Sequence, residues 1–347
     1  MSESESHGEN LIFILSQPRA GSTLLQRILG NHPDVHTVAE PWILLHPIYA
    51  LRYRGHWSEF NNYSAYISLN IFFKELPGGE EDYYEGMRRM FSYLYERAKS
   101  QTGKTIFLDK TPRYYLIIPE LLRLFPNAHY IFLFRNPLAV LSSILLTWRT
   151  NLEILLLSQN KQDLVSAPPR LVEGIRQAAD KGIVVHYEEL VRDPAGEIKN
   201  LCEFIGLNRI DSMTDFSKQG QPNWQQGDHS SINHYTKPEA DHADKWVKGL
   251  NNPQVWRLTN DYLQLLGREF ICKMGYSFDE LHHTLGQHKP NRLRLAGTLP
   301  LRILLGISNF AERGEAFQRG ISWVIHSLSN QGLRKTFTEF PDKVKGV

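Results

Sequence analysis

The amino-acid sequence predicts an α/β fold in which a parallel β-sheet is flanked by helices. Short apolar segments without charges alternate along the chain with segments whose apolar residues recur at helical spacing. Uninterrupted apolar strands are typical of parallel sheets, because helices cover both faces of such a sheet. The chain has 347 residues, of which 41% are hydrophobic, enough for one large domain with an extension.

The first strand and helix are expected near the N-terminus. An apolar run at residues 11–15 precedes a glycine-containing turn, and apolar residues at helical spacing follow at 24–29. The Gly-Asn-His-Pro sequence at 30–33 should end this helix. The turn therefore lies at the carboxyl end of a buried strand, where parallel α/β sheets bind ligands.

The same alternation continues along the chain. Further strands are expected at 105–108, 129–134 and 182–186, and further helices at 115–125, 137–148 and 194–205. Between these units, residues 42–101 and 151–179 are less regular and rich in aromatic and aliphatic residues. We expect them to form a helical cap that shapes an acceptor pocket.

Charge and cysteine content narrow the functional class. The formal net charge is +2, which disfavours a nucleic-acid-binding surface built on bulk charge and leaves room for a local anion site. The two cysteines, Cys202 and Cys272, lie in segments that are expected to be regular. A disulfide framework is therefore not expected. We expect a reducing, cytoplasmic setting instead.

The two ends of the chain differ from its middle. Residues 1–10 are polar and acidic, without the pattern of a signal peptide, and are expected to form a disordered tail. Residues 11–282 would form the main domain, and 283–347 a linker and an amphipathic helical C-terminal extension. This extension would pack on the domain, or contact a membrane surface or a carrier protein. No stretch is apolar over the length of a bilayer.

Residues 17–23 (Gln-Pro-Arg-Ala-Gly-Ser-Thr) combine features of an anion site. Gly21 lets the backbone approach a ligand, and Ser22 and Thr23 add hydroxyls where a helix begins with unpaired N–H groups. Arg19 adds a permanently charged fork for two phosphate or sulfate oxygens. A Walker A lysine is absent, which disfavours ATP hydrolysis. Taken alone, the segment could equally turn the chain and cap the helix.

A second motif follows the strand expected at 129–134. Arg135 lies at the carboxyl end of this strand, Pro137 opens a helix, and Ser143 lies roughly two turns along it. A cation and a hydroxyl could thus converge on a second phosphate. The alternative is a surface arginine that forms only weak ion pairs.

Together these motifs resemble those of a known family. Residues 18–23 resemble the 5′-phosphosulfate-binding loop of sulfotransferases, and 135–143 are similar to their 3′-phosphate-binding element. Residues 185–190 and the helix after them are similar to the strand and tyrosine that follow in this family. The motifs occur in the family's order, and the resemblance covers about residues 10–279.

The resemblance implies the sulfotransferase fold, which is like that of P-loop NTPases. It also implies the co-substrate 3′-phosphoadenosine 5′-phosphosulfate (PAPS), the product 3′-phosphoadenosine 5′-phosphate (PAP), and no metal ion. The residues that would bind PAPS are Arg19, Ala20, Gly21, Ser22, Thr23, Leu24, Arg135, Ser143 and Tyr187. Cytosolic steroid and phenol enzymes carry lysine where this chain has Arg19, so it looks more like the bacterial and Golgi-type branches.

Three residues are candidates for the catalytic groups. Glu40, followed by proline and tryptophan, matches the glutamate base of the bacterial and Golgi-type families; its alternative role is an ion pair or helix cap. His234 is the competing base, in a segment that resembles the mobile flap of bacterial sulfotransferases. Lys110 could stabilise the sulfuryl oxygens or instead pair with Asp109.

Other functions are less favoured by the sequence. The spacings of His229, His234 and His242 match no common zinc site. A P-loop small-molecule kinase would need the missing Walker A lysine. A non-catalytic nucleotide-binding protein would not need both Glu40 and His234. The hydroxyl-bearing acceptor stays open among a small molecule, a lipid, a carbohydrate and a carrier-bound substrate.

Overall fold

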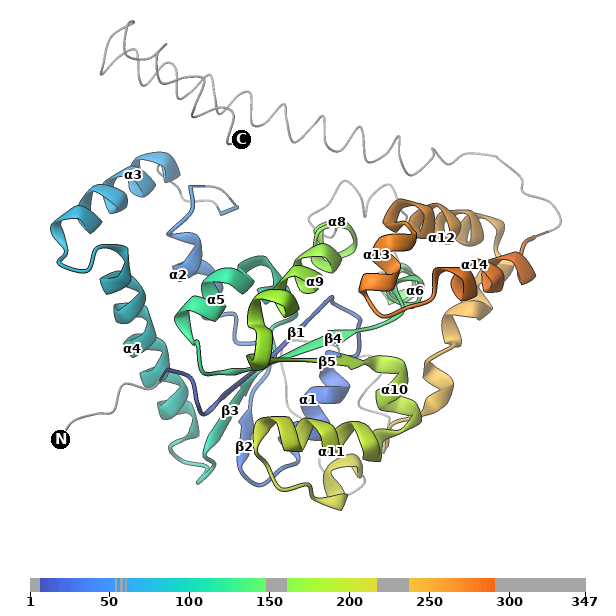
Figure 1. Ribbon diagram of the computed structural model, residues 1–347, viewed down its shortest axis with the longest axis horizontal. Coiled ribbons are helices and arrows are strands. Elements are labelled where there is room, and N and C mark those ends of the chain that lie inside the picture. The colour runs from blue at the N-terminus through green and yellow to red at the C-terminus, as the bar shows by residue number, and fades with distance from the viewer. Residues whose placement is uncertain are drawn as a thin grey trace, which may run out of the picture.

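A five-stranded parallel β-sheet organises the chain (Figure 1). The computed structural model describes residues 7–290, apart from 54, 57, 58, 60, 148–160 and 217–236. The strand order is β2-β3-β1-β4-β5, and every neighbouring pair is parallel. The predicted fold class is thereby confirmed. The strands are β1 (Leu11–Ser16), β2 (Val35–Thr37), β3 (Ile106–Asp109), β4 (His129–Phe134) and β5 (Gly182–His186).

Helices cover both faces of the sheet (Figure 1). One face packs against α1 (Ser22–Gly30), α6 (Pro137–Thr147), α10 (Tyr187–Arg192), α11 (Pro194–Ile205), α12 (Pro253–Leu266), α13 (Arg268–Lys273) and α14 (Phe278–Gln287). The other packs against α2 (Leu45–Tyr49), α4 (Glu80–Lys99), the 3-10 helix η2 (Pro112–Ile117), α5 (Ile118–Leu124) and α9 (Ala167–Ala178). Helix α3 (Asn62–Phe72) has no buried residue.

The two faces carry different side chains because successive residues of a strand point to opposite sides. In β4, Ile131 and Leu133 join the core on the α1 side. Tyr130, Phe132 and Phe134 join the core on the α4 side. We call the first the aliphatic face and the second the aromatic face.

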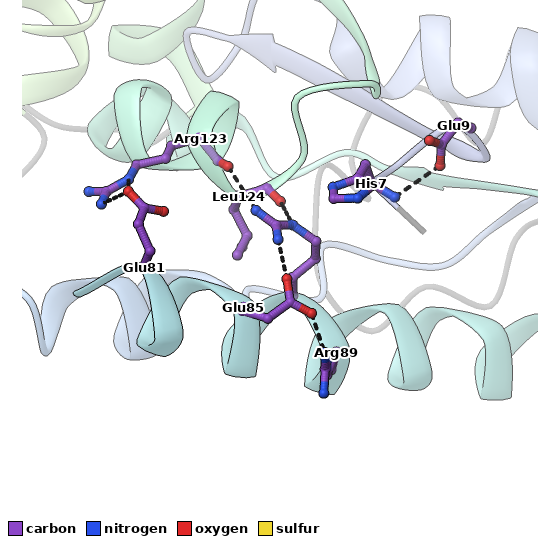
Figure 2. A network of polar contacts seen from close by, with 8 residues as sticks. His7, Glu9, Glu81, Glu85, Arg89, Arg123 and Leu124 are labelled. Carbon is purple, nitrogen blue, oxygen red and sulfur yellow. Dashed lines mark hydrogen bonds and ion pairs between the residues drawn. The ribbon is translucent and has the colours of Figure 1, made fainter. Parts of the chain in front are cut away.

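Helix α4 is joined to α5 by polar contacts along its exposed side (Figure 2). Arg123 Nε of α5 donates to Glu81 at 3.0 Å, and Arg88 Nε donates to the carbonyl oxygen of Leu124 at 2.7 Å. Glu85 accepts hydrogen bonds from Arg88 and Arg89. Exposed pairs of this kind contribute little each. The buried rings and methionine of α4, in the core of the aromatic face, hold it in place.

Several predicted elements are confirmed, and two differences have physical causes. The strands at 129–134 and 182–186 and the helix at 194–205 have the predicted bounds. Strand β2 was not predicted, because three residues are too few to show a period. The helix predicted at 115–125 is wrong in its first part. Pro119 lacks an N–H group and is tolerated only in a helix's first turn, so α5 begins at Ile118.

The predicted domain boundaries can be compared with the described residues. Residues 7–10 are placed, and the amide of Asn127 donates to the carbonyl oxygen of His7. Helix α14 continues past residue 282 to Gln287. The predicted extension beyond residue 290 lies outside the described part of the chain. Within that part, no helix is both long and apolar enough to cross a bilayer.

Candidate functional site

The loop between β1 and α1 leaves the sheet beside the loop after β4. Ser16 at the end of β1 is in register with Leu133 of β4, so both predicted anion motifs start at one edge of the sheet. Helix α1 begins at Ser22, and its N-cap residue, Gly21, has no side chain that could cap it with a hydrogen bond. Its first N–H groups are therefore positioned to meet a ligand.

Gly21 is required at this position for two reasons. Its φ is +96°, a conformation that side chains with a Cβ rarely adopt. A Cβ atom there would also lie 2.3 Å from Cδ2 of Tyr187, far inside van der Waals contact. The buried ring of Tyr187 thus packs directly on the loop, and the Arg135 guanidinium lies 4.3 Å from the centroid of the same ring.

Two hydrogen bonds join the predicted anion motifs. Arg19 Nε donates to Oγ of Ser143 at 3.1 Å. Arg135 Nη1 donates to the carbonyl oxygen of Arg19 at 3.0 Å. The convergence of Arg135 and Ser143 on one phosphate stays a prediction, and Ser143 also accepts this hydrogen bond from Arg19. The two cations and the hydroxyl therefore belong to one continuous site.

A pocket of about 260 Å³ lies at this junction. All predicted donor-binding residues except Ala20 line it; Ala20 is buried in the core of the aliphatic face. The lining also includes residues that the sequence did not single out for this site, namely Ala139, Ser142, Leu146, Lys237, Pro238, Glu239, His242, Lys245 and Trp246. Ala139, Ser142 and Leu146 lie on α6, directly after Arg135. Lys237 and the lining residues after it lie about a hundred residues further along the sequence, and only the fold brings them there.

The donor pocket, as we name it, has an excess of positive charge. Among the described lining residues, Arg19, Arg135, Lys237 and Lys245 are positively charged, and Glu239 is the one carboxylate. Burial, and then the charge of Lys245, lowers the pKa of His242, so this imidazole is neutral near pH 7. The pocket thus suits a ligand that carries several negative charges.

Two buried N–H groups in the donor pocket have no hydrogen-bond partner among the described residues. They are Nε of Arg135 and Nε1 of Trp246. A buried donor without an acceptor costs free energy, so native proteins nearly always pair such groups.

The predicted catalytic residues Glu40 and Lys110 form an ion pair. Lys110 Nζ lies 2.8 Å from Glu40 Oε1, and the lysine side chain is only 1% exposed. Trp42 Nε1 donates to Oε2 of Glu40 at 3.3 Å, so both carboxylate oxygens are held. Asp109, the alternative partner of Lys110, instead accepts hydrogen bonds from Tyr95 and Thr111.

Strand β2 explains why Glu40 meets Lys110. Glu40 follows β2 and Lys110 follows β3, and the two strands are adjacent, with Thr37 in register with Leu108. The carboxyl ends of parallel neighbours lie at the same edge of the sheet. The competing base, His234, lies outside the described residues, as does His229.

A second pocket, of about 770 Å³, lies on the aromatic face. Its lining consists of Trp42, Leu45, Tyr49, Leu51, Arg52, Tyr53, Gly55, Tyr66, Arg113, Tyr115, Leu116, Gln162 and Arg170. Trp42 belongs to this lining and also binds Glu40. We call it the aromatic pocket.

Helix α8 (Lys161–Val165) links the two pockets. Gln17, in the loop between β1 and α1 that we call the donor loop, donates a hydrogen bond to the carbonyl oxygen of Asp163 at 2.8 Å. The carboxylate of Asp163, which is fully buried, accepts from Arg113 Nη2 at 2.7 Å and from the Tyr115 hydroxyl at 2.8 Å. Arg113 and Tyr115 line the aromatic pocket.

Comparison with known proteins decides the family. The model of the sulfotransferase family matches residues 11–211, more than half of the chain. The chain belongs to the sulfotransferase family. The resemblance drawn from the sequence motifs is confirmed.

Two curated sulfotransferase-family relatives align with about the same region. Nodulation protein NoeE of Sinorhizobium fredii is 29% identical over 218 residues, which cover 57% of this chain and 50% of NoeE. A putative protein-tyrosine sulfotransferase of Caenorhabditis briggsae is 26% identical over 216 residues, covering 60% of this chain and 69% of that protein. The chain thus spans only half the length of NoeE.

Solved sulfotransferase structures are similar at lower identity. The sulfotransferase domain of the Synechococcus PCC 7002 olefin synthase is 21% identical, with a TM-score of 0.48. The match covers 76% of this chain and 97% of that domain. The roles of individual site residues stay predictions.

Proposed function

We propose that this chain transfers a sulfuryl group from PAPS to a hydroxyl group of an acceptor. The donor pocket carries this proposal, because four cations and one carboxylate are among its described lining residues. PAPS has anionic groups at both ends of its ribose, which matches two anion motifs joined in one site. The protein-tyrosine sulfotransferases among the relatives act, by their name, on a tyrosyl hydroxyl, which supports a hydroxyl acceptor.

Each motif has a proposed part in donor binding. The loop at Gly21 to Thr23 and the guanidinium of Arg19 would hold the 5′-phosphosulfate, and Arg135 with Ser143 the 3′-phosphate. In the transfer, the acceptor oxygen bonds to sulfur, the bond from sulfur to the phosphate oxygen breaks, and PAP leaves. An arginine keeps its proton, so Arg19 would stabilise the charge that grows on the leaving phosphate.

The acceptor must lose its proton during this step. We propose Glu40 as the base, because Lys110 and Trp42 fix both of its oxygens beside the aromatic pocket. Lys110 would then position Glu40 and lie close to the transferred sulfuryl oxygens. His234 remains the alternative base. Positioning and cations should supply most of the rate enhancement, as in phosphoryl transfer.

Glu40→Gln tests this function. We expect the purified chain to bind PAP and to move radiolabelled sulfate from PAPS to at least one of a phenol, an aliphatic alcohol and a sugar. Glu40→Gln should retain PAP binding by calorimetry and lose about 10²- to 10⁴-fold in turnover, the usual contribution of a general base. The matched control is Glu173→Gln, at an exposed glutamate of α9.

The outcomes separate the alternatives. A wild-type chain that binds no PAP and transfers no sulfate would overturn the proposed function. Undiminished turnover in Glu40→Gln would move the role of base to His234.

A further inference from the structure

The aromatic pocket shares one wall residue, Trp42, with the surroundings of the proposed base, Glu40. Trp42 forms part of its wall and donates a hydrogen bond to Glu40 from the same indole ring. Its volume of about 770 Å³ falls within the range of about 300–1,000 Å³ that is usual for small-molecule sites. A molecule bound in this pocket would contact the indole that holds the proposed base.

The walls of the aromatic pocket favour a flat apolar body. One tryptophan and four tyrosines line it: Trp42, Tyr49, Tyr53, Tyr66 and Tyr115. Three leucines complete the apolar part, Leu45, Leu51 and Leu116. Aromatic walls bind rings by offset stacking and edge contacts, and they add this geometric preference to the effect of apolar area.

The charged residues of the aromatic pocket are all arginines. Its described lining contains Arg52, Arg113 and Arg170, and no aspartate or glutamate. Arg52 is paired with Glu120, and Arg113 with Asp163, which lie outside the lining. These two arginines are therefore largely neutralised.

Arg170 differs from the other two. Its Nη1 donates to the carbonyl oxygen of Leu116 at 3.1 Å, and no carboxylate among the described residues pairs with it. Its charge acts on the pocket walls: burial raises the pKa of Tyr49 and of Tyr115, and the positive charge of Arg170 opposes that rise. Arg170 is thus an exposed cation in the pocket lining, and no carboxylate in the described part of the chain pairs with it.

We propose that the acceptor is an aromatic alcohol that carries a carboxylate remote from the hydroxyl to be sulfated. The ring would lie between the aromatic walls, the carboxylate would pair with Arg170, and the hydroxyl would face Glu40. This rests on the proposed function and adds the class of acceptor to it. The guanidinium fork of arginine matches the two oxygens of a carboxylate, which makes Arg170 a specificity-determining residue.

The test compares two probes that differ only at one end, where one carries a charged carboxylate and the other its uncharged methyl ester. They are 6-hydroxy-2-naphthoate and its methyl ester, titrated into the full chain saturated with PAP and followed by calorimetry. We expect the carboxylate to bind the wild type at least about tenfold more tightly than the ester, as one charge-assisted pair of this kind provides. Arg170→Ala should abolish the preference, and Arg170→Lys should keep part of it.

Arg176→Ala is the matched control. Arg176 lies on the same helix, α9, is exposed, and pairs with Glu173 away from the pocket lining. It should leave the preference for the carboxylate unchanged. Because Arg170 is exposed and its one described hydrogen bond goes to a carbonyl, Arg170→Ala should also retain the wild-type melting temperature and PAP affinity.

The outcomes are distinct from those for the proposed function. If the wild type binds PAP but binds both probes equally, or neither, the proposed acceptor class is wrong while the donor assignment stands. A preference that survives in Arg170→Ala would also overturn it. Failure of the wild type to bind PAP would instead contradict the proposed function itself.

Discussion

The two faces of the sheet differ in both the chemistry of their side chains and the kind of site they support. On the aliphatic face, the donor pocket lies where two strands end and helices begin, and its loop depends on backbone conformation at Gly21. On the aromatic face, the second pocket consists of large side chains from segments scattered between residues 42 and 170. A site such as the donor pocket can be recognised from a short sequence motif. A site such as the aromatic pocket cannot, because its residues are spread along the chain.

Helix α8 is the place where the two faces are joined. Besides the bonds of Asp163, the Tyr262 hydroxyl of α12 donates to the carbonyl oxygen of Leu164 at 2.7 Å. This helix therefore receives contacts from the donor loop, from the aliphatic face and from the walls of the aromatic pocket. Substitutions in α8 should therefore weaken binding of both PAP and the acceptor probe 6-hydroxy-2-naphthoate. A substitution on only one face of the sheet should weaken binding of only the ligand on that face.

Asp163→Asn is expected to have the largest effect. Asparagine keeps the shape of the side chain, but Arg113 loses its carboxylate. Loss of one partner from a buried pair costs about 3–5 kcal/mol, and partial exposure of Arg113 places the expected loss of unfolding free energy near the lower value. Both PAP and 6-hydroxy-2-naphthoate should bind more weakly by calorimetry.

Asp180→Asn, at an exposed aspartate, provides the control for Asp163→Asn. If Asp163→Asn weakened binding of only one of the two ligands, α8 would not couple the two faces.

Gly21→Ala is expected to affect the donor pocket alone. The residue would have to adopt φ near +96° and place its Cβ against the Tyr187 ring. Left-handed strain of about 1–2 kcal/mol and overpacking of about 1–3 kcal/mol together predict a loss of at least about 30-fold in PAP affinity. Affinity for 6-hydroxy-2-naphthoate should not change.

Gly206→Ala separates strain from the steric clash with Tyr187. Gly206 ends α11 with φ +79°, and a Cβ there would meet nothing within 4 Å. It should lower stability slightly without changing PAP affinity. If Gly21→Ala and Gly206→Ala lowered PAP affinity equally, contact with Tyr187 would not shape the donor loop.

The same contrast explains how far the sequence could predict this protein. Strand periods and the motifs at Gly21 and Arg135 predicted most of the sheet and part of the described lining of the donor pocket, because these features are local. Lys245 and Trp246 could not be assigned to the donor pocket, since only tertiary packing brings them to it. Glu40 and Lys110 were each singled out, but their pairing depends on β2, which is too short to predict.

The last expected effect is a dependence of stability on pH, and it involves a single proton on the aromatic face. Burial raises the pKa of Asp109 to about 6, against hydrogen bonds from Tyr95, Thr111 and Tyr114 that lower it. In the unfolded chain an aspartate titrates near pH 4, so the folded state binds this proton more tightly. The resulting stability is fully present below about pH 4 and is lost as the pH rises through 6, by at most about 3 kcal/mol.

Asp109→Asn removes this titration, so the wild type should lose stability relative to the variant between pH 4 and 7 in urea unfolding. Parallel stability curves would show that Asp109 stays ionised in the folded protein, and that the buried hydroxyls around it stabilise the charge as well as water does.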